Sequence, residues 1–233
     1  MAYTTFGAQI TTLTGINLSN STNQSSVDSF LTNAARDILN MVPIQSLVTF
    51  SITSTLDDDP ITFANAGNSI IISVVRKYDT KSSSSQVGRY RECRAISASS
   101  VGIAEDDSGY LEGYSIEDPV YYIQNNTLYV SPTPDATYNA LVHYINYPTV
   151  LYSELAINNF PTLLEQAVVY RAAADAARFL FADEQDEDIY IPMIRDLTNQ
   201  FSNSIKLFLT RFGNPSPIEQ TKDTPNFNKL LGG

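Results

Sequence analysis

The sequence of 233 residues is poor in the residue types that most often carry chemistry, with one cysteine, one histidine and no tryptophan. The lone Cys93 cannot form a disulfide within the chain, which excludes a disulfide-stapled secreted module and favours assembly in the cytosol. No apolar run approaches the length of about 18 residues that a membrane span needs, so no membrane association is expected. The chain starts at Met1 without the basic residues of a signal peptide, and none is expected.

Basic residues are also scarce, since 14 Lys and Arg stand against 25 Asp and Glu and give a formal net charge of −11. This balance disfavours binding of nucleic acid or anionic lipid over the whole surface. One basic cluster remains on two expected strands and the loop between them, and it consists of Arg76, Lys77, Lys81, Arg89, Arg91 and Arg94. The cluster could contact phosphate or an acidic partner, or it could form the polar face of a sheet.

Candidates for catalysis are few. His143 lies in an apolar strand pattern and Cys93 has no evident partner base, so both are interpreted as structural. The acidic residues 57–59 and 105–109 could supply paired acids for glycoside hydrolysis or ligands for calcium. Neither stretch has calcium-loop spacing, and solvated turns are the simpler interpretation. With no P-loop or glycine fingerprint, the sequence predicts a protein that is not an enzyme and has no cofactor or metal.

Three stretches have helical periodicity. The first, residues 27–42, repeats apolar residues at three- and four-residue steps and ends at Pro43. The second runs from Pro161 to about Ala182 and is apolar on nearly every side. The third follows the acidic residues 183–188 and ends at Gly213. Its stripe, which includes Leu197, Phe201, Ile205 and Phe208, is expected to pack against Phe30, Leu31, Ile38 and Leu39 of the first helix.

Between the first two helices the apolar period falls to two, which predicts strands at 47–53, 70–78, 89–96, 120–123, 127–131 and 140–147. Residues 121–123 and 128–130, joined through Gln124-Asn125-Asn126, read as a hairpin. The fold class expected is α+β: a three-helix bundle (27–44 and 150–213) with an inserted antiparallel β domain, sandwich or barrel-like (45–149). An extended N-terminal segment (1–26) and an extended C-terminal arm (214–233) complete the chain.

The second helix has more apolar surface than three helices and a small sheet readily cover, which predicts contact with another subunit. The interface residues expected are Tyr170, Ala173, Ala176 and Phe179. The arm has three prolines and no periodicity, so it is expected to order on a neighbouring subunit or another partner through Phe227, Leu230 and Leu231.

Three motifs in this order resemble a known family. They are Asp28-Ser-Phe-Leu-Thr-Asn-Ala-Ala-Arg-Asp-Ile-Leu-Asn-Met-Val-Pro43, the stretch Asp118-Pro-Val-Tyr-Tyr-Ile-Gln-Asn-Asn-Thr-Leu-Tyr-Val-Ser-Pro-Thr-Pro134, and Tyr147-Pro-Thr-Val150 followed by residues 159–174. Their order and spacing, over most of residues 27–212, resemble the neck or head-completion proteins of tailed bacteriophages, especially marine and cyanobacterial ones.

The resemblance implies a homo-oligomeric ring, a dodecamer, that lies beneath the portal protein, extends the DNA channel and offers a surface to the next neck or tail protein. It further implies a place in the virion neck, assembly in the host cytoplasm, and an arm that docks on the portal through Phe227, Leu230 and Leu231. In such a ring the acidic residues Asp183, Glu184, Asp186, Glu187 and Asp188 would fit a lumen or rim that repels DNA, although an outward, solvated position fits equally.

Two other functions stay open at this point. A carbohydrate-binding or depolymerising virion protein would use the β domain and its aspartates. A tail-terminator or tail-tube subunit would be richer in sheet than this partly helical pattern.

Overall fold

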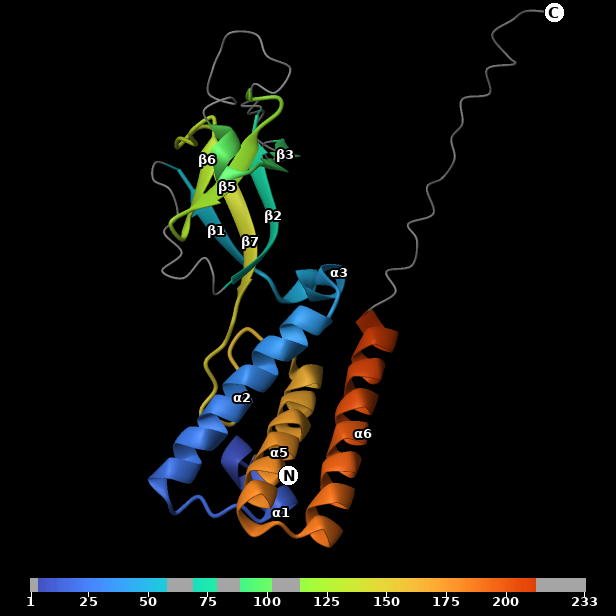
Figure 1. Cartoon of the computed structure of the whole chain (residues 1–233). Coiled ribbons are helices and arrows are strands. Elements are labelled where there is room, and N and C mark those ends of the chain that lie inside the picture. The colour runs from blue at the N-terminus through green and yellow to red at the C-terminus, as the bar shows by residue number, and fades with distance from the viewer. Residues whose placement is uncertain (1–3, 58–68, 79–88, 102–113, 213–233) are drawn as a thin grey trace, which may run out of the picture.

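A computed structural model describes residues 4–57, 69–78, 89–101 and 114–212 of the chain (Figure 1). Among these residues it has five α-helices and seven strands, and the fold is α+β as predicted. The longer helices gather at one end of an elongated molecule and the strands at the other (Figure 1).

The N-terminal residues form helices, so the prediction of an extended segment over residues 1–26 was wrong. Helix α1 (Phe6–Thr14) starts where the Thr5 hydroxyl accepts a hydrogen bond from the Ala8 amide, and it ends at Gly15 with φ 78°. Helix α2 (Ser21–Met41) is capped by the Asn20 side chain, seven residues before its apolar stripe starts at Val27. The first turn of α2 is polar and α1 is short and Thr-rich, so apolar periodicity alone did not reveal where these helices begin.

Helix α5 (Thr162–Glu184) is the central helix of the bundle, and it packs against α1, α2 and α6 (Glu187–Phe212). Figure 1 shows α5 between α2 and α6. The main packing partner of α6 is therefore α5, rather than α2 as predicted. Leu197 and Phe208 of the α6 stripe are buried, whereas Phe201 and Ile205 are half-buried.

The β part consists of two sheets. The first has the order β1-β7-β2-β3 and is antiparallel throughout, with β1 Ile52–Leu56, β7 Ala140–Asn146, β2 Ser69–Lys77 and β3 Tyr90–Glu92. The second has the order β4-β5-β6, with β4 Arg94–Ala95, β5 Val120–Gln124 and β6 Thr127–Ser131. Strand β4 runs parallel to β5, which departs from the all-antiparallel prediction. The sheets share a small apolar core and form no closed barrel among the described strands.

Two predicted strands differ in the structure. Residues 47–50 are helical, in α3 (Ile44–Leu47) and a short 3-10 helix (Val48–Phe50), and β1 starts only at Ile52. The predicted strand 89–96 divides at Cys93 into β3 and β4, which belong to different sheets. The predicted hairpin is confirmed, because β5 and β6 pair and their turn residues Asn125 and Asn126 have φ of 50° and 61°.

The connection from β7 to α5 holds the helices together. The Tyr152 amide donates to Asp28 Oδ1 of α2 at 2.6 Å, and the Tyr152 carbonyl accepts from the Gly7 amide of α1 at 2.7 Å. At the foot of β7, Ile145 is buried and belongs to the apolar core of the helices rather than to that of the sheets. The four-stranded sheet thus anchors the β part in the helical core through the end of β7.

Candidate assembly surfaces

The alanine face of α5 is covered by the chain itself. Ala173 and Ala176 are fully buried in a single chain, beneath the neighbouring helices. The expectation that another subunit covers these two alanines is therefore wrong, because α1, which the sequence analysis read as extended, supplies part of the missing cover. Tyr170 is half-buried, whereas Phe179 is 40% exposed beside Phe30 of α2, at a ring distance of 6.2 Å. Of the four predicted interface residues, Phe179 is the most accessible to another chain.

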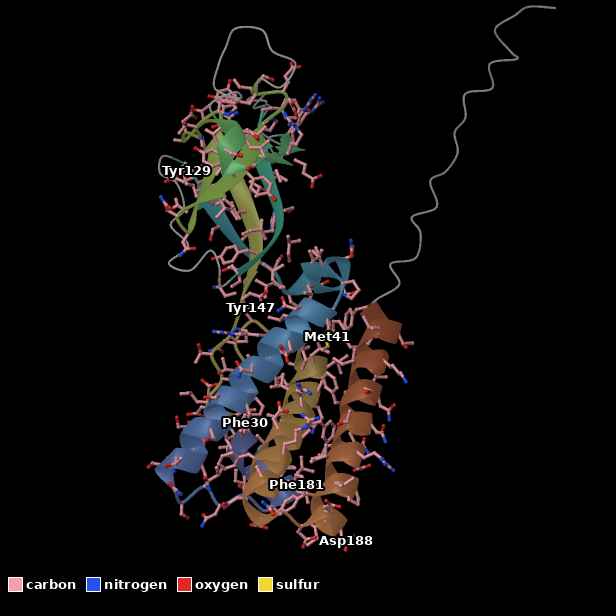
Figure 2. All side chains as sticks on the ribbon, viewed as in Figure 1. Phe30, Met41, Tyr129, Tyr147, Phe181 and Asp188 are labelled. Atoms are coloured by element: carbon pink, nitrogen blue, oxygen red, sulfur yellow. The ribbon has the colours of Figure 1, made fainter. Side chains whose placement is uncertain are left out.

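An exposed apolar surface, the junction patch, lies where the helices meet the β part. It consists of Met41, Ile44 and Val48, which are 58%, 45% and 51% exposed. Two residues after Val48, the ring of Phe50 packs against Phe208 and Phe212 of α6. Figure 2 shows Met41 at the end of α2 nearest the β part. Sequence analysis missed this patch because it read residues 47–53 as a strand; the Pro43 that precedes α3 was the available signal.

The acidic residues 183–188 form the opposite end of the molecule, which we call the acidic tip. All of them are exposed, and Figure 2 shows Asp188 at the end of the bundle farthest from the β part. Two of the carboxylates also have local structural contacts. Asp186 Oδ1 accepts from the Ile189 amide at 3.3 Å, and Glu184 Oε2 accepts from the Tyr190 hydroxyl at 2.6 Å. The bond to Glu184 is the main cause that raises the pKa of Tyr190 to about 12.

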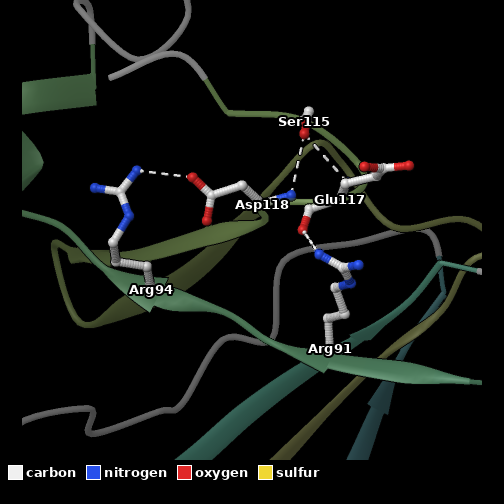
Figure 3. Close-up of polar contacts among 5 residues, drawn as sticks. All are labelled: Arg91, Arg94, Ser115, Glu117 and Asp118. Atoms are coloured by element: carbon white, nitrogen blue, oxygen red, sulfur yellow. Dashed lines mark hydrogen bonds and ion pairs between the residues drawn. The ribbon is translucent and has the colours of Figure 1, made fainter. Parts of the chain in front are cut away.

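Two residues of the basic cluster, Arg91 and Arg94, make contacts within the β part (Figure 3). Arg94 pairs with Asp118 at 3.3 Å, and Arg91 donates to the Glu117 carbonyl at 2.7 Å while its guanidinium lies 4.9 Å from the ring centre of Tyr78. The hydroxyl of Ser115 accepts from the amides of Glu117 and Asp118 and fixes the same turn. These two arginines therefore hold residues 115–118 against β3 and β4.

Arg76 is not a surface residue at all. Its side chain is 3% exposed, and its Nη2 donates to the Thr133 carbonyl at 3.2 Å, while its Nε and Nη1 have no hydrogen-bond partner in the described part of the chain. Burial lowers the pKa of this guanidinium. Lys81 lies outside the described residues. With Arg76 buried and Arg91 and Arg94 engaged, the polar sheet face is a better description of the cluster than a phosphate site.

The catalytic candidates occupy structural positions. His143 Nδ1 lies 2.8 Å from Thr53 Oγ1 and joins β7 to β1. Cys93 is buried, and desolvation raises the pKa of its thiol to about 12. Asp57 is exposed, while Asp58, Asp59 and residues 105–109 lie outside the described residues. Among the residues that the structure describes, no three His, Cys, Asp or Glu side chains are grouped to hold a metal, and no helix is long and apolar enough to cross a membrane.

The candidate surfaces lie at different positions along the molecule. The junction patch lies midway along the molecule, and the acidic tip and the β part form its two ends (Figures 1 and 2). The structure thus keeps the exposed apolar residues of the patch apart from the acidic residues. Phe227, Leu230 and Leu231 of the arm lie outside the described residues.

A comparison with protein families decides between the open functions. The model of the family described as SU10 adaptor protein matches residues 1–207. The chain belongs to the SU10 adaptor protein family. It is therefore a structural adaptor protein of a phage, a component of the virion that associates with other virion proteins, and its family is not a known enzyme class. A search of curated proteins found no match to the adaptor. The resemblance to phage neck proteins is confirmed at the level of an adaptor, and the narrower likeness to marine and cyanobacterial phages stays a prediction.

Proposed function

We propose that the adaptor forms a dodecameric ring between the portal protein of the phage head and the next neck or tail protein, and that the ring extends the DNA channel. Membership of an adaptor family over most of the chain supports this role. A subunit in such a ring needs contacts with two ring neighbours and with a different partner on each side along the axis.

The distribution of exposed residues carries the proposal. The junction patch offers three apolar side chains midway along the molecule, where lateral neighbours in a ring would meet. The two ends differ in chemistry, since the acidic tip is the connection between α5 and α6 and the other end is made of sheet. An elongated subunit with an exposed apolar patch in its middle and two unlike ends suits lateral contacts through the patch, and the exposed Ile189 and Ile191 beside the acidic tip add apolar surface at that end.

The acidic tip also suits the passage of DNA. A channel that binds phosphate tightly would slow passage, because each neutralised phosphate adds salt-dependent affinity. Five carboxylates in six residues, all exposed and repeated around a ring, would repel DNA instead. We propose that Asp183, Glu184, Asp186, Glu187 and Asp188 line the lumen or its rim.

Electron microscopy of the purified full-length adaptor, alone and mixed with its portal protein, tests the proposal. The expected result is rings of the adaptor, or portal particles extended by one added ring, with a channel along the axis. An adaptor that stays monomeric in both samples contradicts the proposal, and release or binding of sugars by that monomer would favour the carbohydrate alternative. Filaments or tubes of stacked discs would favour a tail-tube subunit.

A further inference from the structure

One edge of β2 is only partly paired. Strand β2 pairs with β7 along most of its length, but β3 pairs with it only at Val75–Lys77. The Cys93 amide then donates to the Val74 carbonyl at 2.7 Å, after which the chain leaves this sheet. From Ser69 to Ser73, this edge of β2 has no partner strand among the described residues.

A second open edge lies beside it. Strand β4 is the outermost strand of the other sheet, and it hydrogen-bonds to β5 through the amides of Arg94 and Ile96. Its other edge faces no strand in the part of the chain that the structure describes. Among the described strands, the crossing of the chain at Cys93 therefore leaves two unpaired edges next to one another.

A cavity of about 360 Å³, which we call the edge notch, lies between these two edges. Its apolar lining comes from both sheets, with Ile72 and Val74 of β2, Ala95 of β4 and Tyr121 of β5. Glu92 and Arg94 add charged groups of opposite sign to the lining. The lining is therefore mixed, and the volume has room for a large side chain that contacts the apolar groups of both sheets.

An open strand edge beside an apolar pocket is the arrangement that binds an extended peptide by strand addition. The peptide gains main-chain hydrogen bonds along the edge, and every second side chain can enter a pocket on one face. Such an edge, left uncovered, also promotes unwanted aggregation, so a protein that retains one is expected to fill it in its assembled state.

We propose that the edge notch is filled by the C-terminal segment of a neighbouring copy of the adaptor, with residues 226–231 added as a strand beside β2 and Phe227 in the notch. This inference rests on the proposed ring, which supplies the neighbouring copy. Residues 227, 229 and 231 of an extended strand share one face, so Phe227 and Leu231 would face the apolar lining on either side of Lys229. Glu92 offers a carboxylate for that lysine.

The place where α6 ends favours this occupant. Phe212, its last residue, packs on Phe50 at a ring distance of 5.7 Å, next to the junction between the helices and the β part. Figure 1 shows that α6 ends at the height where the β part begins. The C-terminal segment therefore starts close to the sheets rather than at the acidic tip.

The length of the segment allows it to reach a neighbouring copy. Thirteen residues, 213–225, separate Phe212 from the proposed strand, and three of them are prolines that favour extended backbone. At about 3.1 Å per residue such a linker spans roughly 40 Å. The whole of β2, with nine residues, spans only about 30 Å. A linker of this reach is long enough for the segment to leave its own subunit and enter the notch of the next one in a ring.

Photo-crosslinking in the full-length adaptor tests the inference. Phe227 is replaced by p-benzoylphenylalanine, and this chain is mixed with isotopically heavy parent chain under assembly conditions and irradiated. The expected result is a crosslink from position 227 to heavy peptides that contain residues 72–74 or 92–95. The same sample is imaged for rings.

Two matched variants of the heavy chain show whether the notch itself is occupied. Ala95→Trp fills the notch from an exposed position and should lower the crosslink yield at least about tenfold, a loss of about 1.4 kcal/mol in docking. Ala136→Trp makes the same change at an exposed position outside the notch lining and should leave the yield unchanged. Thermal melting of both variants checks that they fold.

The outcomes separate this inference from the proposed function. Rings whose position 227 crosslinks only to its own chain or to another surface, or an equal yield in both tryptophan variants, overturn the filled notch and leave the ring in place. If portal protein is added and position 227 then crosslinks only to the portal, the filled notch is likewise overturned. If light-to-heavy crosslinks form at the notch in a sample without rings, the C-terminal segment of another copy fills the notch. The proposed closed ring is then contradicted.

Discussion

At the residue scale, four arginines of this acidic chain make contacts within the subunit. Arg91 and Arg94 hold one turn of the β part, and Arg171 joins α5 to α2 through Asp37 at 3.8 Å. Arg178 pairs with Asp175 on the same helix at 2.5 Å. Exposed pairs of this kind add only about 0 to 1 kcal/mol each. Their main consequence is that these guanidinium groups are already engaged and do not offer DNA a cationic surface.

Cys93 should be unreactive in the folded protein. Burial raises the pKa of its thiol from 9.0 to about 12, so at pH 8 the thiolate fraction falls about 1000-fold, and the alkylation rate with it. Labelling by iodoacetamide, followed by intact mass, should be negligible in buffer and complete in denaturant. Because the folded pKa is the higher one, this thiol destabilises the fold only above about pH 9, where the unfolded chain ionises first. Complete labelling of folded protein within minutes would show that Cys93 is accessible.

Phe208 and its neighbour Leu207 form a matched test of the helical core. Phe208 is fully buried and contacts Phe50 and Phe212, whereas Leu207 is well exposed. Phe208→Ala should lower the free energy of unfolding by about 3 to 5 kcal/mol through lost transfer energy and a cavity. Leu207→Ala should change it by no more than about 0.5 kcal/mol. Equal midpoints for the two variants in urea unfolding would contradict the packing of α6 described here.

At the element scale, sequence periodicity predicted the elements that bury one clear face. The stripe from Val27 marked most of α2, and the apolar run after Pro161 marked α5. Helix α1 was missed because its core contacts come from a few residues, such as Phe6 and Ile10, within a Thr-rich stretch. Residues 47–50 were read as a strand because a run this short fits either period. No local signal says that β3 and β4 belong to different sheets, since sheet membership is decided by distant partners.

Helix α5 should tolerate no charge on its alanine face. Ala173→Glu places a carboxylate in a fully buried position between helices, with no room for a partner, and should lower the free energy of unfolding by more than about 3 kcal/mol. The matched variant Gln166→Glu adds the same charge at an exposed position of α5 and should be nearly neutral. Circular dichroism melting curves distinguish the two. If the Ala173→Glu protein folded normally but did not assemble, Ala173 would belong to a subunit interface and not to the core.

At the scale of the whole molecule, the sequence predicted the character of the assembly surfaces better than their location. The acidic tip was recognisable as a run of carboxylates, and the structure places it at one end of the molecule. The alanines of α5 were expected at an interface and are core residues instead. The junction patch was missed because residues 47–53 were interpreted as a strand, and Pro43 signals the start of α3 but not which of its side chains are exposed.

The junction patch should control ring formation. Val48→Glu puts a charge on the patch, and because Val48 is half exposed the subunit itself should remain folded. Burying that unpaired charge between subunits should cost several kcal/mol per contact and prevent rings. Gln45→Glu, at an exposed position three residues earlier in α3, is the control and should still form rings. Mass photometry at equal concentrations measures both, and identical ring populations would place the ring interface elsewhere.

The acidic tip should set how weakly assembled rings hold DNA. Asp188→Lys changes the charge by two units per subunit at the tip, and Asp196→Lys makes the same change farther along α6, also at an exposed position. If the tip lines the channel, only the first variant should bind DNA more tightly, with a steeper dependence on salt. Fluorescence anisotropy of labelled duplex at several NaCl concentrations measures this. Equal affinities for the two variants would place the tip outside the lumen.

The burial of Ile145 in the helical core has a mechanical consequence. Since the foot of β7 is embedded among the helices, a force that tilts the β part must first pull an apolar side chain into water. The two chain crossings at this point, 50–52 and 146–150, leave from the adjacent strands β1 and β7 and brace each other. We expect a subunit built in this way to resist bending at this junction. A ring of such subunits would keep its height when the packed genome presses on it, and pressure would be transmitted along the subunit instead of being absorbed by a hinge.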